Sequence, residues 1–164
     1  MPTHKGYNRK ISDRIKALSS FCEKGLVTFD LCCDHGLIGF NAHQDNDFKK
    51  VVFVDQIKSI TDALKKRISL HASNQPFEVL CLPAEKISLP DEPVNVIIAG
   101  VYAATIFDVI KSVPLSREGD TYIFSPNSDH GIFEKKIENH GLKVIDKVIV
   151  EENKRTYPIY KCQK

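Results

Sequence analysis

The chain has 164 residues, of which 42% are hydrophobic, and a formal net charge of +2. This length predicts one domain, residues 1–164, with a single substantial core, and a second domain does not fit comfortably. The apolar runs are much shorter than a membrane span, and the polar start lacks the apolar region of a signal peptide, so we expect a cytoplasmic protein with no membrane partner. A charge this mild does not establish a nucleic-acid partner.

The cysteines indicate neither a disulfide framework nor a zinc ribbon, because their number is odd and no C-x-x-C spacing occurs. They are Cys22, Cys32, Cys33, Cys81 and Cys162. Cys32, Cys33 and His35 could be imagined as metal ligands, but alternate residues at a strand end point in different directions and no fourth ligand is apparent. We predict reduced, buried or half-buried thiols and no metal site.

The N-terminal segment, residues 1–24, is predicted to be a basic helix that covers the sheet. The helix spans Asn8 to Cys22, with Ile11, Ile15 and Leu18 at helical spacing, and ends before Gly25. Its basic residues lie mostly off this apolar stripe and can face phosphates. Arg9 and Arg14 are therefore candidate substrate-binding residues. The alternative is a charged face that only contacts solvent.

The chain is organised around Val27 to Gly39, with the sequence V-T-F-D-L-C-C-D-H-G-L-I-G. A short run of β-formers, Val27 to Leu31, precedes a polar turn and a second apolar run that predicts a helix to about His43. Ligands bind at the carboxyl ends of parallel strands, so this turn is the expected site. The residues expected to line the crevice are Asp30, Asp34, His35 and Gly36.

The acidity of this turn discriminates between cofactors. Asp30 and Asp34, with no Lys or Arg between Val27 and Phe48, would repel a pyrophosphate. S-adenosylmethionine carries a sulfonium and an ammonium but no phosphate, so two carboxylates suit it. The same features disfavour a nicotinamide-binding oxidoreductase. The alternative is that Asp30 and Asp34 merely cap the helix.

The second and third strands add the next candidates. Asp55 ends the buried strand Val51–Val54 and is placed to accept hydrogen bonds from ribose hydroxyls, or to cap the predicted helix Ile57–His71. A third strand, Phe77–Leu82, leads to Pro83. At its exit, the Ala84 N–H and the Glu85 carboxylate could contact an adenine ring, since Pro83 has no N–H to donate.

The fourth strand, Val94 to Gly100, is the most apolar, and Gly100 allows a ligand to approach the backbone closely. The helix that follows extends to about Val113. Tyr102 at its start could stack on a base or could simply pack.

A fifth strand, Asp120 to Phe124, leads to Ser125-Pro126-Asn127, and Asn127 or Ser128 is predicted to cap a helix that Gly141 ends. The segments Val144–Val150 and Thr156–Cys162 predict a closing hairpin. Pro158 removes a ladder hydrogen bond, so we expect a bulge or a locally unpaired edge there.

Together these elements resemble the class I methyltransferase variant of the Rossmann fold, a mostly parallel seven-stranded sheet with a C-terminal antiparallel hairpin and helices on both faces. More narrowly, the chain resembles the bacterial tRNA adenine-22 N1-methyltransferases, the TrmK family. The stretches that carry the resemblance are Ile11–Phe21, the D-x-x-x-D-H of Asp30, Asp34 and His35, the I-I-A-G of Ile97–Gly100, and Ser125–Asn127. They span nearly the whole chain.

This resemblance implies transfer of a methyl group from S-adenosylmethionine to N1 of an adenine in tRNA, or in another RNA. The candidate cofactor-binding residues are Asp30, Cys32, Asp34, His35, Gly36, Asp55, Gln56, Ala84, Glu85 and Gly100. The candidate substrate-binding residues are Arg9, Arg14, Tyr102, Ser125 and Asn127. Asp34 is the candidate catalytic residue, and Tyr102 or Phe124 would support the extruded base.

The chain departs from the family pattern at several points. Cys32 stands where the family has glycine, Gly100-Val101-Tyr102-Ala103 replaces G-M-G-G, and the family's C-terminal helical extension is missing. These departures leave two alternatives open. The first is a non-catalytic RNA- or protein-binding module on a methyltransferase fold, and the second is a methyltransferase with another acceptor.

Overall fold

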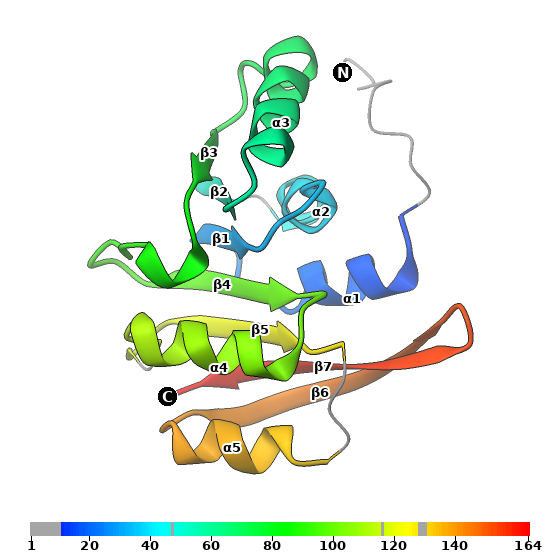
Figure 1. The fold of residues 1–164 in the computed structure, drawn as a ribbon, viewed down its shortest axis with the longest axis vertical. Helices are drawn as coiled ribbons and strands as arrows, with labels where there is room; N and C mark the ends of the chain where they lie inside the picture. Colours follow the sequence, from blue (N-terminus) through cyan, green and yellow to red (C-terminus); the bar gives the residue numbers. More distant parts are fainter. Residues whose placement is uncertain (1–10, 47, 116, 128–130) are drawn as a thin grey trace.

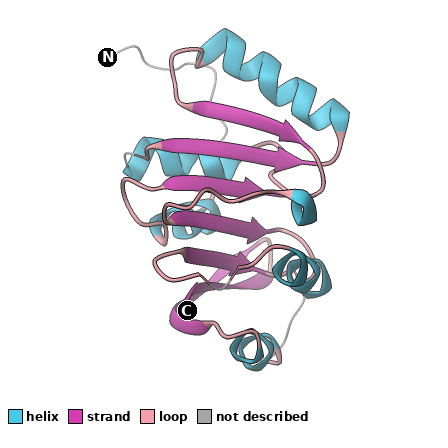
Figure 2. Cartoon of the chain, turned by 90° about the vertical axis from the view of Figure 1, so that its left-hand side faces the viewer, coloured by secondary structure: helices cyan, strands magenta, loops and turns pink. Residues whose placement is uncertain are grey.

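The computed structural model describes residues 11–46, 48–115, 117–127 and 131–164, which form a sheet with helices on both faces (Figures 1 and 2). The strands are β1 Val27–Leu31, β2 Lys50–Asp55, β3 Phe77–Cys81, β4 Val94–Ala99, β5 Thr121–Ser125, β6 Lys143–Glu152 and β7 Arg155–Gln163. The helices are α1 Asp13–Ser20, α2 Leu37–Asn46, α3 Lys58–His71, α4 Ala103–Ser112, α5 Phe133–Asn139 and the 3-10 turn η1 Ala84–Lys86. None of the described helices is both long enough and apolar enough for a membrane span.

The seven described strands form one sheet in the order β3-β2-β1-β4-β5-β7-β6. β1 to β5 pair in parallel, and β7 is antiparallel to both of its neighbours, β5 and β6. This is the fold class that the sequence predicts. Because the strand order reverses at β1 and β4, the carboxyl ends of these two strands flank a topological switch point, where open α/β sheets bind their ligands.

Alternate side chains of the central strands enter opposite layers of the core. On β4, Val96 and Ile98 belong to the cluster under α4 and α5, whereas Ile97 and Ala99 belong to the cluster under α1, α2 and α3. Burial on both faces explains why the central strands are continuous apolar runs. It also explains why their positions are predicted to within one or two residues.

Two helix termini differ from the prediction. Within the described residues the N-terminal helix is α1, which begins after the N-cap Ser12 and ends at Ser20, well before Gly25. The Ser20 hydroxyl donates to the Ala17 carbonyl at 2.8 Å, a bond that competes with continuation of the helix. At α5 the N-cap is Ile132, which makes no side-chain cap bond, so the prediction that Asn127 caps this helix is wrong. The other predicted cap, Ser128, lies outside the described residues.

The β6–β7 hairpin extends beyond the carboxyl end of β5. β6 and β7 pair as far as Glu152 and Arg155, whereas the last β5–β7 pair is Phe124–Tyr160. The hairpin tip therefore projects past the sheet on the side of α1, as Figure 1 shows. Pro158 lies in the part of β7 that has no β5 partner, so its missing N–H costs no hydrogen bond to β5. The bulge in the hairpin is elsewhere, between Val144 and Asp146 of β6.

A buried amide ties the segment between α1 and β1 to the sheet. Asn95 of β4 is completely buried. Its Oδ1 accepts from the Glu23 N–H at 2.9 Å, and its Nδ2 donates to the Glu23 carbonyl at 2.9 Å and to Thr28 Oγ1 at 3.0 Å. All polar atoms of this amide are thus used in fixing where the chain leaves α1, and with it one wall of the site described next.

Candidate active site

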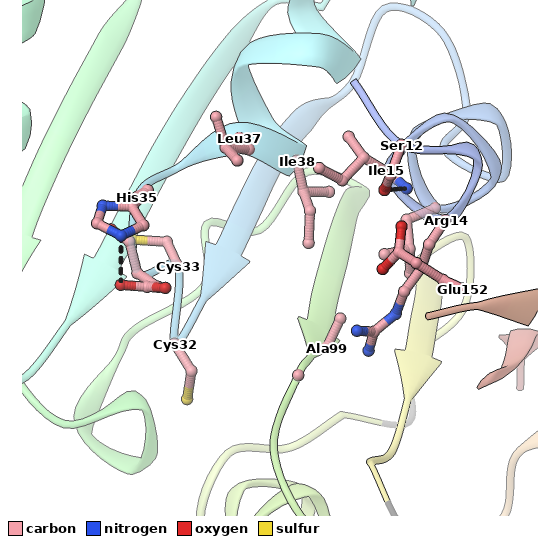
Figure 3. A pocket seen from close by; sticks show the side chains of 13 residues that line it. Ser12, Arg14, Ile15, Cys32, Cys33, His35, Leu37, Ile38, Ala99 and Glu152 are labelled. Atoms are coloured by element: carbon pink, nitrogen blue, oxygen red, sulfur yellow. Dashed lines mark hydrogen bonds and ion pairs between the residues drawn. The ribbon is translucent and has the colours of Figure 1, made fainter. Parts of the chain in front are cut away.

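A cavity of about 230 Å³ lies at the carboxyl edge of the sheet, where β1 and β4 end. Its walls come from the β1–α2 turn, from α1, from the end of β4 and from the end of β6 (Figure 3). The predicted site residues that line it are Arg14, Cys32, Asp34, His35 and Gly100. The structure thus brings the predicted turn residues and part of the opposite wall together in one cavity.

The backbone of the β1–α2 turn is left-handed at every second residue. The φ angles are 56° at Cys32, 48° at Asp34 and 70° at Gly36. Glycine is the residue that adopts this conformation without cost, and Asp tolerates it better than most residues. The turn therefore keeps a glycine-type path although Cys32 stands where the resemblance expects glycine.

Gly36 has a packing role as well. A Cβ at this position would lie 2.9 Å from Leu64 Cδ2 and 3.0 Å from Phe53 Cε1, in addition to the strain of the positive φ. The turn is thus pressed against the core of α3 and β2 at this point. Only glycine fits both the backbone angle and the space.

Asp55 of β2 holds the turn from the side. Its Oδ2 accepts from the Asp34 N–H at 3.2 Å, and its Oδ1 accepts from the Ile57 N–H at 2.9 Å, just before α3 begins. The N-cap of α3 is Ile57, which makes no side-chain cap bond, so the prediction that Asp55 caps this helix is wrong. The Asp55 side chain instead fixes the backbone before α3 and the neighbouring β1–α2 turn. Each oxygen keeps a second lone pair for a further donor.

Asp30 lies behind the turn and does not line the cavity. It is 1% exposed, and its Oδ2 accepts from the Gly39 N–H in the first turn of α2 at 3.1 Å. Burial raises the pKa of this carboxyl to about 7; the Gly39 hydrogen bond opposes the rise, and the Asp55 carboxylate adds to it. Asp30 therefore supports the start of α2, as in the capping alternative. It lies behind the β1–α2 turn and has no surface in the cavity.

On the opposite wall, Arg14 reaches from α1 to the ends of β5 and β7. Its guanidinium carbon lies 4.0 Å from the centre of the Tyr157 ring, and its Nη2 donates to Ser125 Oγ at 3.4 Å. Burial is the main influence on this guanidinium and lowers its pKa, while the neighbouring Tyr157 and Glu152 raise it. Arg14 is thus a partly desolvated cation inside the cavity, and not part of a solvated charged face.

The remaining described residues that were predicted for the site do not line this cavity. Gln56 is exposed, Ala84 is buried and Glu85 is half-buried at the ends of β2 and β3. Tyr102 is 66% exposed beside the end of β4, which excludes the packing role for its ring. Asn127 donates its Nδ2 to the Gly100 carbonyl at 2.8 Å and so ties the exits of β4 and β5 together.

Two expectations from the sequence are wrong, and a third concerns a residue outside the described part of the chain. Phe124 is completely buried in the core, so it cannot support an extruded base. Cys81 is exposed at the end of the edge strand β3, in contrast to the other cysteines, which are buried or half-buried as predicted. Arg9 is outside the described residues.

The sequence misses one charged residue of the cavity, Glu152. It precedes the two-residue hairpin turn Asn153-Lys154, which has φ angles of 51° and 61°. In sequence, E-E-N-K-R is typical of any polar hairpin tip. Only the unequal lengths of β5 and the hairpin bring this tip to the cavity.

A seven-stranded sheet of this order, with an acidic turn after β1 and a carboxylate at the end of β2, defines the class I methyltransferase type of α/β protein. A protein-family model described as a methyltransferase domain matches residues 11–160, and the chain belongs to this family. None of the curated proteins matches the chain in sequence.

Solved structures with this fold include two tRNA methyltransferases. The B. subtilis M1A22 tRNA methyltransferase TrmK has a TM-score of 0.80 at 17% identity, covering 94% of this chain and 66% of that one. M. capricolum TrmK, in complex with S-adenosyl-homocysteine, has a TM-score of 0.77 at 15% identity, covering 95% of this chain and 70% of that one. The chain thus spans about two thirds of the length of these proteins.

A third solved structure with this fold is a methyltransferase named for a different substrate. Magnesium protoporphyrin IX methyltransferase (ChlM) from Synechocystis PCC 6803, with bound SAM, has a TM-score of 0.70 at 10% identity, covering 96% of this chain and 88% of that one. These likenesses confirm the predicted fold class. S-adenosylmethionine, the cofactor that the sequence predicts, is bound in this fold in ChlM.

The buried Asp30 generates a prediction on the pH dependence of stability. Its pKa of about 7 is above the value of 3.8 for a free carboxyl, so the folded state retains the proton between these values. The wild-type free energy of unfolding should therefore fall from pH 4 to pH 7 by roughly 2–4 kcal/mol more than that of Asp30→Asn. Urea titrations at several pH values measure this difference; Asp62→Asn, an exposed change, should keep the wild-type slope. Parallel curves for wild type and Asp30→Asn would contradict the assignment.

The left-handed turn generates a second prediction. At Cys32, a glycine variant should be more stable than an alanine variant by about 1 kcal/mol, because alanine keeps the Cβ that strains a positive φ. At Cys33, whose φ is not positive, the order should reverse, since glycine costs about 0.5–1 kcal/mol of chain entropy. Denaturant unfolding of the four variants measures both differences. Equal stability of the two Cys32 variants would show that the turn is relaxed.

Proposed function

We propose that this protein transfers the methyl group of S-adenosylmethionine to N1 of an adenine in tRNA, and that it acts in the cytoplasm. The observation that carries the proposal is the cavity at the switch point, which has an acidic turn on one side and a cation, Arg14, on the other. The structural likeness to TrmK proteins supports the choice of acceptor, because these proteins are named for methylation of A22 in tRNA.

The strand order divides the carboxyl edge into two halves. On the cofactor half, Asp55 of β2 would accept hydrogen bonds from the ribose hydroxyls, and Ala84 and Glu85 after β3 would face the adenine ring. The exposed carboxylate of Asp34 would hold the ammonium group of the methionine part. The sulfonium would then lie near Gly100, which has a positive φ of 76° and, as a glycine, places no side chain at the end of β4.

The other half of the edge, over β4 and β5, would receive the acceptor base. The lone pair of adenine N1 attacks the methyl carbon, the bond from carbon to sulfur breaks, and its electrons return to sulfur as a neutral thioether. No proton has to leave N1, so positioning supplies much of the acceleration. Positive charge passes from sulfur to the base, and a nearby carboxylate stabilises it. Asp34 is the proposed catalytic residue for this purpose.

N1 lies on the pairing edge of adenine, so the base must be unpaired or extruded before it can react. Tyr102 offers an exposed ring two residues after Gly100, next to the end of β4, and is the proposed stacking surface. Asn127 would line the base from the β5 side, whereas Ser125 is completely buried and would act through its hydrogen bond with Arg14. Arg9 would contact phosphates of the RNA.

The cofactor site generates a prediction on binding. Asp55→Ala should weaken S-adenosylhomocysteine binding at least tenfold, because both the ribose acceptor and the bond to the Asp34 N–H are lost. Isothermal titration calorimetry measures the affinity, and Asp62→Ala, on the exposed face of α3, is the matched control. If Asp55→Ala binds like the wild type while remaining folded, the proposed ribose contact is wrong.

Methyl transfer itself is the test of the acceptor. Incubation of the protein with S-adenosylmethionine and unmodified bulk tRNA should yield 1-methyladenosine, detected by mass spectrometry of nucleosides. Asp34→Asn should weaken cofactor binding, because the partner of the ammonium group is lost, and should also lower the single-turnover rate about tenfold or more when S-adenosylmethionine is saturating. Cofactor binding with no methylated nucleoside would favour a non-catalytic module or another acceptor, such as the small molecule on which ChlM acts.

A further inference from the structure

Two side chains of opposite charge share the wall of the cavity that faces the acceptor half. Arg14 comes from α1 and Glu152 from the last residue of β6, and Figure 3 shows them next to each other, away from Cys32 and His35. Among the described residues, neither of them belongs to an ion pair. Glu152 nevertheless influences the titration of Arg14, so the two charges are within electrostatic range.

Arg14 is held in place at an energetic cost. Its guanidinium is stacked on Tyr157, its bond to Ser125 is long at 3.4 Å, and its Nε is enclosed without a hydrogen-bond acceptor among the described residues. Desolvating a cation without a paired carboxylate is unfavourable, and a protein seldom keeps such an arrangement for stability alone. The remaining N–H groups of the guanidinium are the ones available to a ligand, and Figure 3 shows this end of the side chain directed towards Ala99 at the end of β4.

The position of this pair along the sheet assigns it to the acceptor. Ser125 ends β5 and Tyr157 belongs to β7, so Arg14 lies on the far side of β4 from the β1–α2 turn. The cofactor half runs from β3 to β1. A ligand group near Arg14 and Glu152 would therefore belong to the second substrate, whose reacting atom must lie near Gly100.

We propose that Arg14 and Glu152 together recognise the Hoogsteen edge of the acceptor adenine. The guanidinium donates to N7, and the Glu152 carboxylate accepts from the N6 amino group. This inference rests on the proposed function and specifies how its substrate is selected. Adenine presents one acceptor and one donor on this edge, whereas guanine presents two acceptors, so Glu152 would repel the O6 of guanine.

This arrangement leaves N1 free and matches the charge change of the reaction. N1 lies on the other side of C6 from N7, so both contacts can be made while N1 faces the methyl group. In the product the positive charge is shared between N1 and the N6 amino group. Glu152 at N6 therefore stabilises the developing cation, and Arg14 acts at N7, farther from that charge.

The test uses pentaribonucleotides with uridine at every position except the centre, which is adenine, 7-deazaadenine or guanine. Their affinities are measured by competition in fluorescence anisotropy, with the protein saturated with S-adenosylhomocysteine so that its own adenosine site is filled. The wild type should bind the adenine probe about tenfold more tightly than the 7-deaza probe, which lacks the N7 acceptor. It should also prefer adenine to guanine.

The variants assign each contact to its side chain. Arg14→Met should remove the difference between adenine and 7-deazaadenine, whereas Glu152→Gln should reduce the preference for adenine over guanine, because an amide can donate to O6. The matched controls are Lys16→Met, on the exposed face of α1, and Glu151→Gln, the exposed neighbour of Glu152; both should keep the wild-type ratios. Each result is a ratio within one variant, so a partial loss of folded protein does not change it.

The outcomes separate this inference from the proposed function. If the wild type binds S-adenosylhomocysteine but binds all three probes equally, the recognition of the Hoogsteen edge is wrong and the cofactor site stands. A 7-deaza penalty that persists in Arg14→Met also overturns the role of Arg14. If S-adenosylhomocysteine does not bind to the wild type, the proposed function and this inference fail together.

Discussion

One carboxylate holds together the part of the molecule on which the site depends. Asp55 of β2 accepts from the backbone of the β1–α2 turn and, with its other oxygen, from the backbone just before α3. The turn contains two non-glycine residues with positive φ, Cys32 and Asp34, and such strain persists only where the surroundings fix it. The bond from Asp55 and the close packing around Gly36 provide that constraint, so the turn keeps a glycine-type path with few glycines.

The same arrangement sets the charge of the cofactor half. Asp34 and Asp55 lie around a single turn with the buried Asp30 behind it, and the pKa of Asp30 is raised mainly by burial and further by the Asp55 carboxylate. A concentration of carboxylates at a helix N-terminus offsets the attraction that such a terminus exerts on phosphates. The site is thereby suited to a nucleoside with a positive charge and no phosphate.

The proposed acceptor half is built from elements that are far apart in the sequence, α1 and the β6–β7 hairpin. Arg14 is placed by α1, whereas Tyr157 and Glu152 are placed by a hairpin that continues beyond β5. The connection through Asn95 fixes how α1 reaches this point. These elements meet at the carboxyl edge of the sheet. Arg14 and Glu152 are therefore brought into the same cavity only when the protein folds.

By itself the sequence determined the strands, the fold class and the turn after β1, because a strand buried on both faces is a continuous apolar run and the residue that follows it is at the ligand edge. The place of Asp55 at the end of β2 follows for the same reason, while its role in cofactor binding stays a prediction. Tertiary structure alone decided that Asp30 lies behind the wall, that Phe124 is in the core, that Asn127 joins two strand exits, and that Glu152 reaches the cavity. Each of these depends on register, strand length or the direction of a side chain relative to distant elements, and local periodicity carries no information about such long-range geometry.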